Sequence, residues 1–233
     1  MVNTAIILAG GLGTRLRNVA PTVPKPMASI NNRPFLEYLM DFWIEQGVSN
    51  FILSVGYLKN KIIEHFGNEY KGANIKYTIE LKPLGTGGAL LLAGKDLNDT
   101  FLVLNGDTFI EIDLKRFYSF HVESESNWSI ALFRTSNVSR YTGIDINKNG
   151  QINSLISELK NSDALANGGA YLMEPKIFDL LACNSGDSVS LENELLPNFV
   201  SNGGVLFGKE FKGKFIDIGI PEDFYRAQDI LPN

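Results

Sequence analysis

The sequence predicts an α/β fold, a Rossmann-like three-layer sandwich with a mostly parallel, mixed central sheet. Three observations indicate it. Short apolar runs alternate with amphipathic stretches, helix-ending glycines follow the amphipathic stretches, and a glycine-rich loop directly follows the first apolar run. With 233 residues, 44% of them apolar, the chain can bury a full core without disulfide bonds. We expect a single domain over residues 1–233.

The first half of the chain alternates between expected strands and expected helices. The strands are predicted at residues 5–8, 51–55, 75–79 and 101–104. The helices are predicted at residues 34–46, 59–66 and 86–93, followed by Gly47, Gly67 and Gly94. Such alternation indicates parallel strands with helices on both faces of the sheet.

The second half is less regular, which makes the predicted sheet mixed rather than purely parallel. A helix is expected at 114–124, and strands at 128–133, 143–146, 151–156 and 169–173; the middle two would be antiparallel additions. Further on we expect helices at 175–181 and 190–201, strands at 205–207 and 215–217, and a closing helix from Pro221.

The charge is unevenly distributed along the chain. The net charge of −5 argues against a general nucleic-acid binder, which would need a basic surface. The first 36 residues nevertheless carry no acidic side chain and four basic ones, at Arg15, Arg17, Lys25 and Arg33. The glycine-rich loop lies within this basic segment, which indicates an anionic ligand.

Cysteine and histidine are scarce, which limits the metal sites that the chain can build. The single Cys183 excludes an internal disulfide, and with His65 and His121 it leaves little for zinc, so any metal should be a hard, oxygen-bound cation. No apolar run approaches the roughly 20 residues of a membrane span, and residues 4–9 are too few for a signal-peptide core. We therefore expect a cytoplasmic protein without membrane or nucleic-acid partners; a homo-oligomer stays open.

The loop AGGLGTRL at residues 9–16 has the composition of a phosphate-binding loop. Its glycines let backbone N–H groups approach an anion, and it follows a strand at the edge where ligands of α/β sheets bind. The frame Pro24-Lys25-Pro26 restricts the backbone around a lysine. No Gly-Lys-Ser/Thr follows and the third glycine of a dinucleotide loop is absent. A glycine-rich turn with solvated cations is the alternative.

Together, LAGGLGTRL and PKPM resemble the signature of the sugar-1-phosphate nucleotidyltransferases, which join a nucleoside triphosphate to a sugar 1-phosphate and release pyrophosphate. Four later blocks follow in the family's order and start at Glu80 (ELKPLGTGGA), Leu104 (LNGD), Asn167 (NGGAY) and Phe215 (FIDIGIPED). The chain most resembles the D-glycero-D-manno-heptose and mannose 1-phosphate guanylyltransferases. The resemblance implies a GT-A-like nucleotidyltransferase fold, with a nucleotide-binding part at about residues 1–112 and a sugar-phosphate-binding part at about 113–233.

The resemblance assigns the chemistry to a few charged residues. Arg15 would hold the leaving pyrophosphate, Lys25 would neutralise charge around the α-phosphate, and Asp107 would complete the catalytic set. Asp107 and Asp217 follow apolar strands and would bind Mg²⁺. The alternative is structural: Asp107 as a turn residue and Asp217 as the cap of the last helix.

The same resemblance outlines the nucleotide site. It comprises Leu8, Ala9, Gly10, Gly11, Gly13, Thr14, Arg15, Lys25, Glu80, Pro83, Gly85, Thr86, Gly106 and Asp107. Glu80 would face the base edge, where a carboxylate can accept two hydrogen bonds from N1–H and N2–H₂ of guanine. UTP or dTTP with a hexose 1-phosphate is the closest alternative, and a solvated surface glutamate is the structural one.

The sugar-phosphate site rests on a weaker match. By resemblance it comprises Asn105, Thr142, Gly143, Glu158, Lys160, Asn167 and Gly168. Glu158 would accept sugar hydroxyls, Lys160 would pair with the phosphate, and Asn167 would present its amide. The chain departs from the family here, because Thr142 interrupts the usual Arg-Tyr-Gly and the segment from Lys160 to Asn167 is short.

The implied activity is the transfer of GMP from GTP to a sugar 1-phosphate, with D-glycero-α-D-manno-heptose 1-phosphate as the expected acceptor. A non-catalytic, nucleotide-sugar-sensing subunit would have lost Arg15, Lys25, Asp107 or Asp217, and all four are present. A glycosyltransferase would need a close Asp-x-Asp pair. The nearest spacing, Glu111-Ile112-Asp113, is predicted to cap a helix instead.

Overall fold

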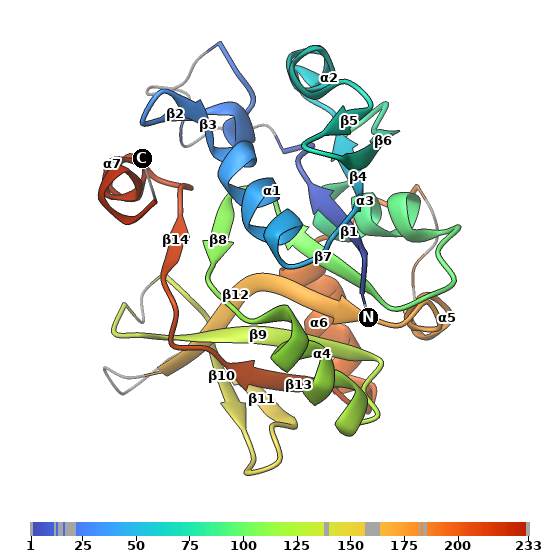
Figure 1. The fold of residues 1–233 in the computed structure, drawn as a ribbon. Helices are drawn as coiled ribbons and strands as arrows, with labels where there is room; N and C mark the ends of the chain where they lie inside the picture. Colours follow the sequence, from blue (N-terminus) through green and yellow to red (C-terminus); the bar gives the residue numbers. More distant parts are fainter. Residues whose placement is uncertain are drawn as a thin grey trace.

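The computed structural model of the chain describes residues 2–11, 13, 16, 22–137, 140–156, 164–181, 183 and 186–231. Within this part the predicted fold class is confirmed (Figure 1): a mixed, mostly parallel sheet with helices against it. No helix in these ranges is long and apolar enough to cross a membrane.

The centre of the sheet is parallel, as the strand-helix alternation predicts. Strand β1 (Thr4–Leu8) lies between β4 (Asn50–Val55) and β7 (Phe101–Asn105) and is parallel to both. Beyond β4 the sheet continues with parallel β6 (Ala73–Ile79) and a short antiparallel edge strand, β5 (Glu69–Tyr70).

The other side of the sheet is built by the second half of the chain. Long strand β12 (Ala164–Met173) runs antiparallel to β7 and also pairs with β9 (Trp128–Thr135). The expected antiparallel additions are confirmed as β10 (Gly143–Ile146) and β11 (Ile152–Ile156). The strand expected at 205–207 is shifted: β13 covers Phe207–Glu210 because it pairs with β9 there.

The helices occur close to where the sequence predicts them. They are α1 (Phe35–Glu45), α2 (Lys59–Phe66), α3 (Gly85–Gly94), α4 (Leu114–Glu123), α5 (Ile177–Leu180), α6 (Leu196–Ser201) and α7 (Pro221–Ile230). The helix expected at 190–201 is divided, because a π-helical turn, η3 (Leu191–Leu195), precedes α6. Asp113 caps α4 by accepting the Arg116 N–H at 2.9 Å, as predicted.

Two hydrophobic cores lie on opposite faces of the sheet. Successive strand residues alternate between them: Ala5 and Ile7 belong to one core, and Ile6 and Leu8 to the other. Helix α1 packs into the first with Trp43, while α3, η3 and α6 pack into the second. This alternation produces the three-layer arrangement.

Several short elements lie near the carboxyl edge of the sheet; β14 was predicted at 215–217, whereas the others were not predicted. Strand β8 (Thr108–Ile110) pairs with β14 (Phe215–Asp217), and β2 (Ser29–Ile30) pairs with β3 (Arg33–Pro34) after a 3-10 turn, η2 (Lys25–Met27). The C-terminal helix α7 lies beside the β2–β3 hairpin (Figure 1), where Asn31 donates to the Gln228 carbonyl. The C-terminal helix thus lies next to the hairpin that follows η2.

Candidate functional site

A cavity of about 830 Å³ opens at the carboxyl ends of the parallel strands. Leu8 ends β1, Asn105 ends β7 and Glu80 follows β6, and all three line the cavity. The second half of the chain contributes Asn167 and Phe215 to the same wall. Both halves therefore contribute to one site at the edge where α/β sheets bind their ligands.

Two carboxylates that line this cavity, Asp107 and Asp217, form a charged cluster with Lys25, which lines a smaller recess beside it. The Lys25 ammonium forms an ion pair with the Asp107 carboxylate, and its Nζ lies 3.9 Å from Asp217 Oδ1. The lysine side chain is only 10% exposed. The structure thus brings together residues from three distant parts of the sequence. Lys25 lies 82 positions before Asp107, and Asp217 lies more than 100 positions after Asp107.

The local backbone structure explains why Lys25, Asp107 and Asp217 lie close together. Lys25 starts η2 directly after Pro24, which has the extended backbone that proline favours. Asp107 lies between β7 and β8, and Asp217 ends β14, opposite Thr108 on β8. A backbone hydrogen bond of 3.0 Å from the Ile218 N–H to the Asp107 carbonyl holds the two aspartates side by side.

The helix-cap alternative for Asp217 is wrong. Residue Ile220 is the N-cap of α7 and that position has no side-chain cap bond. Asp217 instead accepts the Gly219 N–H at 2.7 Å with Oδ1 and the Arg140 guanidinium at 2.7 Å with Oδ2. Its carboxylate is therefore oriented toward the charged cluster.

The donor set around Lys25 suits a hard divalent cation. Asp107 and Asp217 both contact one ammonium group, so one small cation could reach both carboxylates. No group of three or more His, Cys, Asp or Glu side chains with metal-binding spacing occurs in the described ranges. The protein can thus supply two oxygen ligands, which leaves the other positions of a Mg²⁺ ion to phosphate and water.

The glycine-rich loop borders a smaller recess of about 170 Å³ next to the charged cluster. Ala9, Gly11, Gly13 and Gly106 line it together with Lys25. Gly13 has φ +58°, a conformation that favours glycine, and a Cβ on Gly106 would lie 2.7 Å from the Leu8 carbonyl oxygen. Thr14 and Arg15 lie outside the described residues.

Glu80 is held in a fixed orientation at the far end of the main cavity. The hydroxyl of buried Ser54 donates to Oε1 at 3.2 Å, and the Leu84 N–H donates to Oε2 at 3.2 Å. A Cβ on Gly10 would overlap the carboxylate, so only glycine leaves room for it. Glu80 is therefore not a freely solvated surface glutamate. Pro83, Gly85 and Thr86 line the cavity beside it.

The predicted sugar-site residues are only partly brought together. Asn105, Thr142 and Asn167 line the cavity. Gly143 and Gly168 are buried and do not line it; a Cβ on Gly168 would lie 2.5 Å from Ile110 Cδ1. Glu158 and Lys160 lie outside the described residues. The pairing of β12 with β9 shifts in register between Asn167 and Tyr171, and this irregularity turns Asn167 toward the cavity wall.

Several cavity residues were missed by the sequence analysis, among them Glu192, Arg140 and Tyr141. Glu192, in η3, accepts hydrogen bonds from Thr86, Asn105 and Tyr171. Arg140 pairs with Asp217 and with Asp223, and Tyr141 lines the cavity next to it. The Arg-Tyr pair is visible in the sequence as a family block, whereas nothing local distinguishes Glu192 from a solvated helix residue.

Burial sets the protonation state of the tyrosines. It raises the pKa of Tyr141 to about 12, with a further contribution from the negative charge of Asp217. Burial also raises the pKa of Tyr171 well above 10. Both phenols therefore stay neutral at pH 7 and can donate hydrogen bonds.

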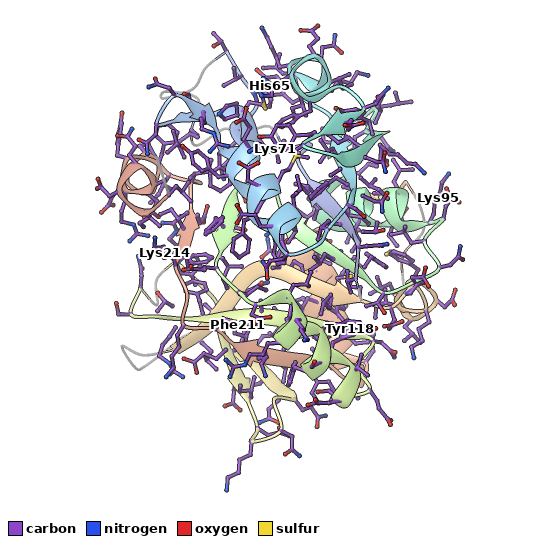
Figure 2. The ribbon with its side chains drawn as sticks, viewed as in Figure 1. His65, Lys71, Lys95, Tyr118, Phe211 and Lys214 are labelled. Atoms are coloured by element: carbon purple, nitrogen blue, oxygen red, sulfur yellow. The ribbon has the colours of Figure 1, made fainter. Side chains whose placement is uncertain are left out.

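Arg33 belongs to a different charged cluster, away from the cavity. It pairs with Glu37 at 3.0 Å and with Asp41 at 2.6 Å, while Lys71 and His65 contact the same two carboxylates. Figure 2 shows His65 and Lys71 in the upper half of the molecule, where α1 and α2 lie. The basic N-terminal segment is thus divided: Lys25 belongs to the charged cluster beside the cavity, and Arg33 pairs with two carboxylates of α1.

Residues 4–233 match the family described as Nucleotidyl transferase. This chain belongs to that family. It is 38% identical to a D-glycero-alpha-D-manno-heptose 1-phosphate guanylyltransferase from Campylobacter jejuni, over 95% of this chain and 96% of the relative. A protein of the same description from Aneurinibacillus thermoaerophilus is also 38% identical, with 97% of both chains covered.

Among solved structures, this nucleotidyl transferase is similar to HddC from Yersinia pseudotuberculosis. The TM-score is 0.84 at 37% sequence identity, covering 98% of this chain and 99% of that chain. HddC has also been solved in complex with GMP-PN, and that structure superimposes with a TM-score of 0.83.

Proposed function

We propose that the protein joins GTP and a sugar 1-phosphate to give a GDP-sugar and pyrophosphate, with D-glycero-α-D-manno-heptose 1-phosphate as acceptor. One observation carries the proposal: a single cavity is lined by a fixed, acceptor-only carboxylate, Glu80, and by Asp107 and Asp217, the two ion-pair partners of Lys25. The former suits a guanine edge and the latter suits phosphate chemistry. The heptose-specific relatives and the GMP-PN complex of HddC agree with this assignment.

The reaction is an in-line displacement at the α-phosphorus of GTP. A phosphate oxygen of the sugar 1-phosphate forms the new bond to that phosphorus while the bond to the β-phosphate oxygen breaks, and pyrophosphate leaves with the electron pair. The enzyme's task is to position the two phosphates and neutralise their charge. In this proposal Lys25 contacts the α-phosphate and the incoming phosphate, because its ammonium pairs with Asp107 and Asp217, which line the cavity. Arg15 holds the pyrophosphate.

We assign Mg²⁺ to Asp107 and Asp217. When bound there, the ion would neutralise phosphate charge and act as a Lewis acid. The Lys25 ammonium lies between both carboxylates in the described arrangement. The two aspartates would also orient Lys25, since both carboxylates attract its ammonium group.

The nucleotide would lie over the first part of the chain, about residues 1–112. Backbone amides of Gly10, Gly11 and Gly13 would contact phosphates, and Leu8, Ala9, Pro83, Gly85, Thr86 and Gly106 would complete that wall. Glu80 would accept hydrogen bonds from N1–H and N2–H₂ of guanine. Its orientation by Ser54 and Leu84 supports this role, because it leaves acceptor positions for a ligand.

The acceptor sugar would lie over the second part, about residues 113–233. Asn105, Thr142 and Asn167 line this side, and Glu158, Lys160, Gly143 and Gly168 complete the proposed set. We further propose that the protein works in the cytoplasm, as a monomer or homo-oligomer. It would bind no partner other than its two substrates.

A matrix of nucleotides against sugar 1-phosphates tests the proposal. We expect pyrophosphate release to require Mg²⁺ and to be fastest with GTP and heptose 1-phosphate, slower with mannose 1-phosphate, and at least about tenfold slower with UTP, dTTP or ITP. ITP lacks the 2-amino group, so Glu80→Gln should lower the preference for GTP over ITP, whereas Glu69→Gln, on an exposed edge strand, should not. A preference for UTP or dTTP, or an unchanged preference in Glu80→Gln, would overturn the guanine assignment.

A further inference from the structure

Glu192 occupies a position in the cavity that none of the roles above uses. Its Oε1 accepts hydrogen bonds from Asn105 Nδ2 at 3.0 Å and Tyr171 OH at 3.3 Å, and its Oε2 accepts one from Thr86 Oγ1 at 2.7 Å. The carboxylate lines the cavity. Three donors converge on it, from the start of α3, the end of β7 and the middle of β12.

The Glu192 carboxylate has one lone-pair position left that can accept a hydrogen bond from a ligand. An ionised carboxylate has about four lone-pair positions, two on each oxygen. Asn105 and Tyr171 use both positions of Oε1, and Thr86 uses one of the two on Oε2. One acceptor position remains on Oε2, and since a carboxylate can only accept, its partner must be a hydroxyl or an N–H.

The donors themselves are fixed by further hydrogen bonds, so they are not free to turn away. Thr86 Oγ1 accepts the Leu191 N–H at 2.8 Å, and Tyr171 OH accepts from Asn167 Nδ2 at 2.9 Å. The Asn167 side chain is held in turn because its Oδ1 accepts the Gly169 N–H at 2.9 Å. Glu192 is therefore rigidly placed, which is what selective recognition requires.

The neighbours of Glu192 indicate which substrate supplies the donor. Asn105 and Asn167 lie on the side of the cavity that the proposed function gives to the sugar, and Asn193 lines the wall next to Glu192. Leu196 and Pro197 add an apolar surface below it. Phosphate groups would be repelled by the carboxylate, whereas a sugar ring presents several hydroxyl donors.

We propose that Glu192 selects the sugar 1-phosphate by accepting a hydrogen bond from one of its ring or side-chain hydroxyls through the remaining position of Oε2. This inference rests on the proposed function and deepens it by naming a specificity-determining residue of the acceptor half. Through the same hydrogen bonds Glu192 connects Thr86, on the proposed nucleotide side of the cavity, to Asn105 and Tyr171, on the proposed sugar side.

The variant Glu192→Gln removes the proposed contact and leaves the network intact. Gln can keep Asn105 and Tyr171 on its Oε1 and place its NH₂ in the position of Oε2, where it can donate to Thr86 Oγ1. The hydrogen-bond acceptor for the sugar is then replaced by a donor. Glu194→Gln is the matched control, because Glu194 lies in the same turn, is exposed and accepts the Ser190 N–H at 2.9 Å.

Steady-state kinetics with GTP and heptose 1-phosphate test the proposal, after wild-type turnover has established the reaction itself. We expect Glu192→Gln to raise the KM for the sugar 1-phosphate about tenfold or more and to change the KM for GTP less than about threefold. Glu194→Gln should change neither. An unchanged KM for the sugar, or an equal rise in both, would overturn the proposal, whereas an inactive wild type would overturn the proposed function instead.

Monodeoxy sugar 1-phosphates give a second measurement that does not depend on the variant's stability. For the wild type, one deoxy analogue should lose about tenfold in kcat/KM because Oε2 is left without its donor. With Glu192→Gln, the same analogue should lose much less in kcat/KM. This difference is the coupling that a double-mutant cycle measures for two groups in direct contact. Equal losses in both proteins for every analogue would contradict a direct contact.

Discussion

At the scale of single residues, the site depends on a few side chains whose partners come from distant parts of the chain. Lys25 is buried against Asp107 and lies near Asp217, so each of these groups is placed by the other two. Glu80 is placed by Ser54, by the Leu84 N–H and by the absence of a side chain at Gly10. A single substitution in either arrangement should therefore change turnover or the preference for the base.

Asp107→Asn should abolish most turnover while leaving the fold intact. The amide has no negative charge to orient Lys25 or to hold a cation, so we expect kcat to fall about 10²–10³-fold or more. Asp113→Asn is the control: Asp113 is also at an element boundary, but it only caps α4, so that variant should keep wild-type turnover. Wild-type kcat in Asp107→Asn, measured as pyrophosphate release, would exclude Asp107 from the reaction.

Gly10→Ala should impair the choice of base. The new Cβ would overlap the Glu80 carboxylate and push it out of its position, so the preference for GTP over ITP should fall about tenfold. A Cβ on neighbouring Gly11 would meet no protein atom within 4 Å, which makes Gly11→Ala the matched control. The measured quantity is the ratio of kcat/KM for the two nucleotides; an equal change in both variants would argue against Glu80 as the base-contacting group.

At the scale of elements, the site is assembled by connections that follow the strands. The first residue of α3, Gly85, has φ +69°, and the segment around Val189 packs directly on this end of the helix: the Gly87 and Gly88 N–H groups donate to the Val189 carbonyl. This contact joins the nucleotide side of the cavity to η3, which carries Glu192. Helix α4 is joined to the sheet differently, through buried His121.

Gly85→Ala should destabilise the protein by more than backbone strain alone. An alanine there would have φ in the left-handed region and a Cβ 2.5 Å from the Val189 carbonyl oxygen. Gly47→Ala has the same kind of backbone strain, at φ +96°, but no neighbour within 4 Å. We expect a loss of about 1 kcal/mol for Gly47→Ala and at least about 2 kcal/mol for Gly85→Ala, measured by urea denaturation. Equal losses would show that the contact with Val189 has no energetic weight.

The stability of the protein should decrease as the pH falls below about 6.5, the ordinary pKa of histidine. Burial lowers the pKa of folded His121 although Glu174 acts in the opposite direction. Unfolded chains therefore bind a proton at this side chain before folded ones do, so its contribution is fully present above the unfolded pKa and is lost as the pH falls from there toward the folded pKa.

Urea denaturation at pH 7.5 and pH 5.5 measures this dependence. The difference in the free energy of unfolding between the two pH values should be smaller in His121→Gln than in the wild type, because Gln does not titrate. Gln can still bond to Ser129 and Glu174, the two partners of His121. His65→Gln, at an exposed position, is the control. An identical pH dependence in all three proteins would contradict a buried, neutral His121.

At the scale of the whole molecule, the central parallel strands, the helices and the charged cluster could be predicted, and long-range details could not. Lys25, Asp107 and Glu80 are recognisable because each belongs to a local sequence block with glycine or proline neighbours. Glu192 was missed because its role depends on Thr86, more than 100 residues away in the sequence. Strand β14 was predicted at 215–217, whereas β8, with only three residues, is defined by its pairing with β14 rather than by its sequence pattern.

The central claim is that one cavity transfers GMP from GTP to a sugar 1-phosphate. Its most direct test is ³¹P NMR of the wild-type protein with Mg²⁺, GTP and D-glycero-α-D-manno-heptose 1-phosphate. We predict that the signals of GTP and the sugar phosphate decrease together while one GDP-heptose and one pyrophosphate appear for each GTP consumed. Release of inorganic phosphate and GDP with the sugar phosphate unchanged, or no consumption of GTP at all, would contradict the account.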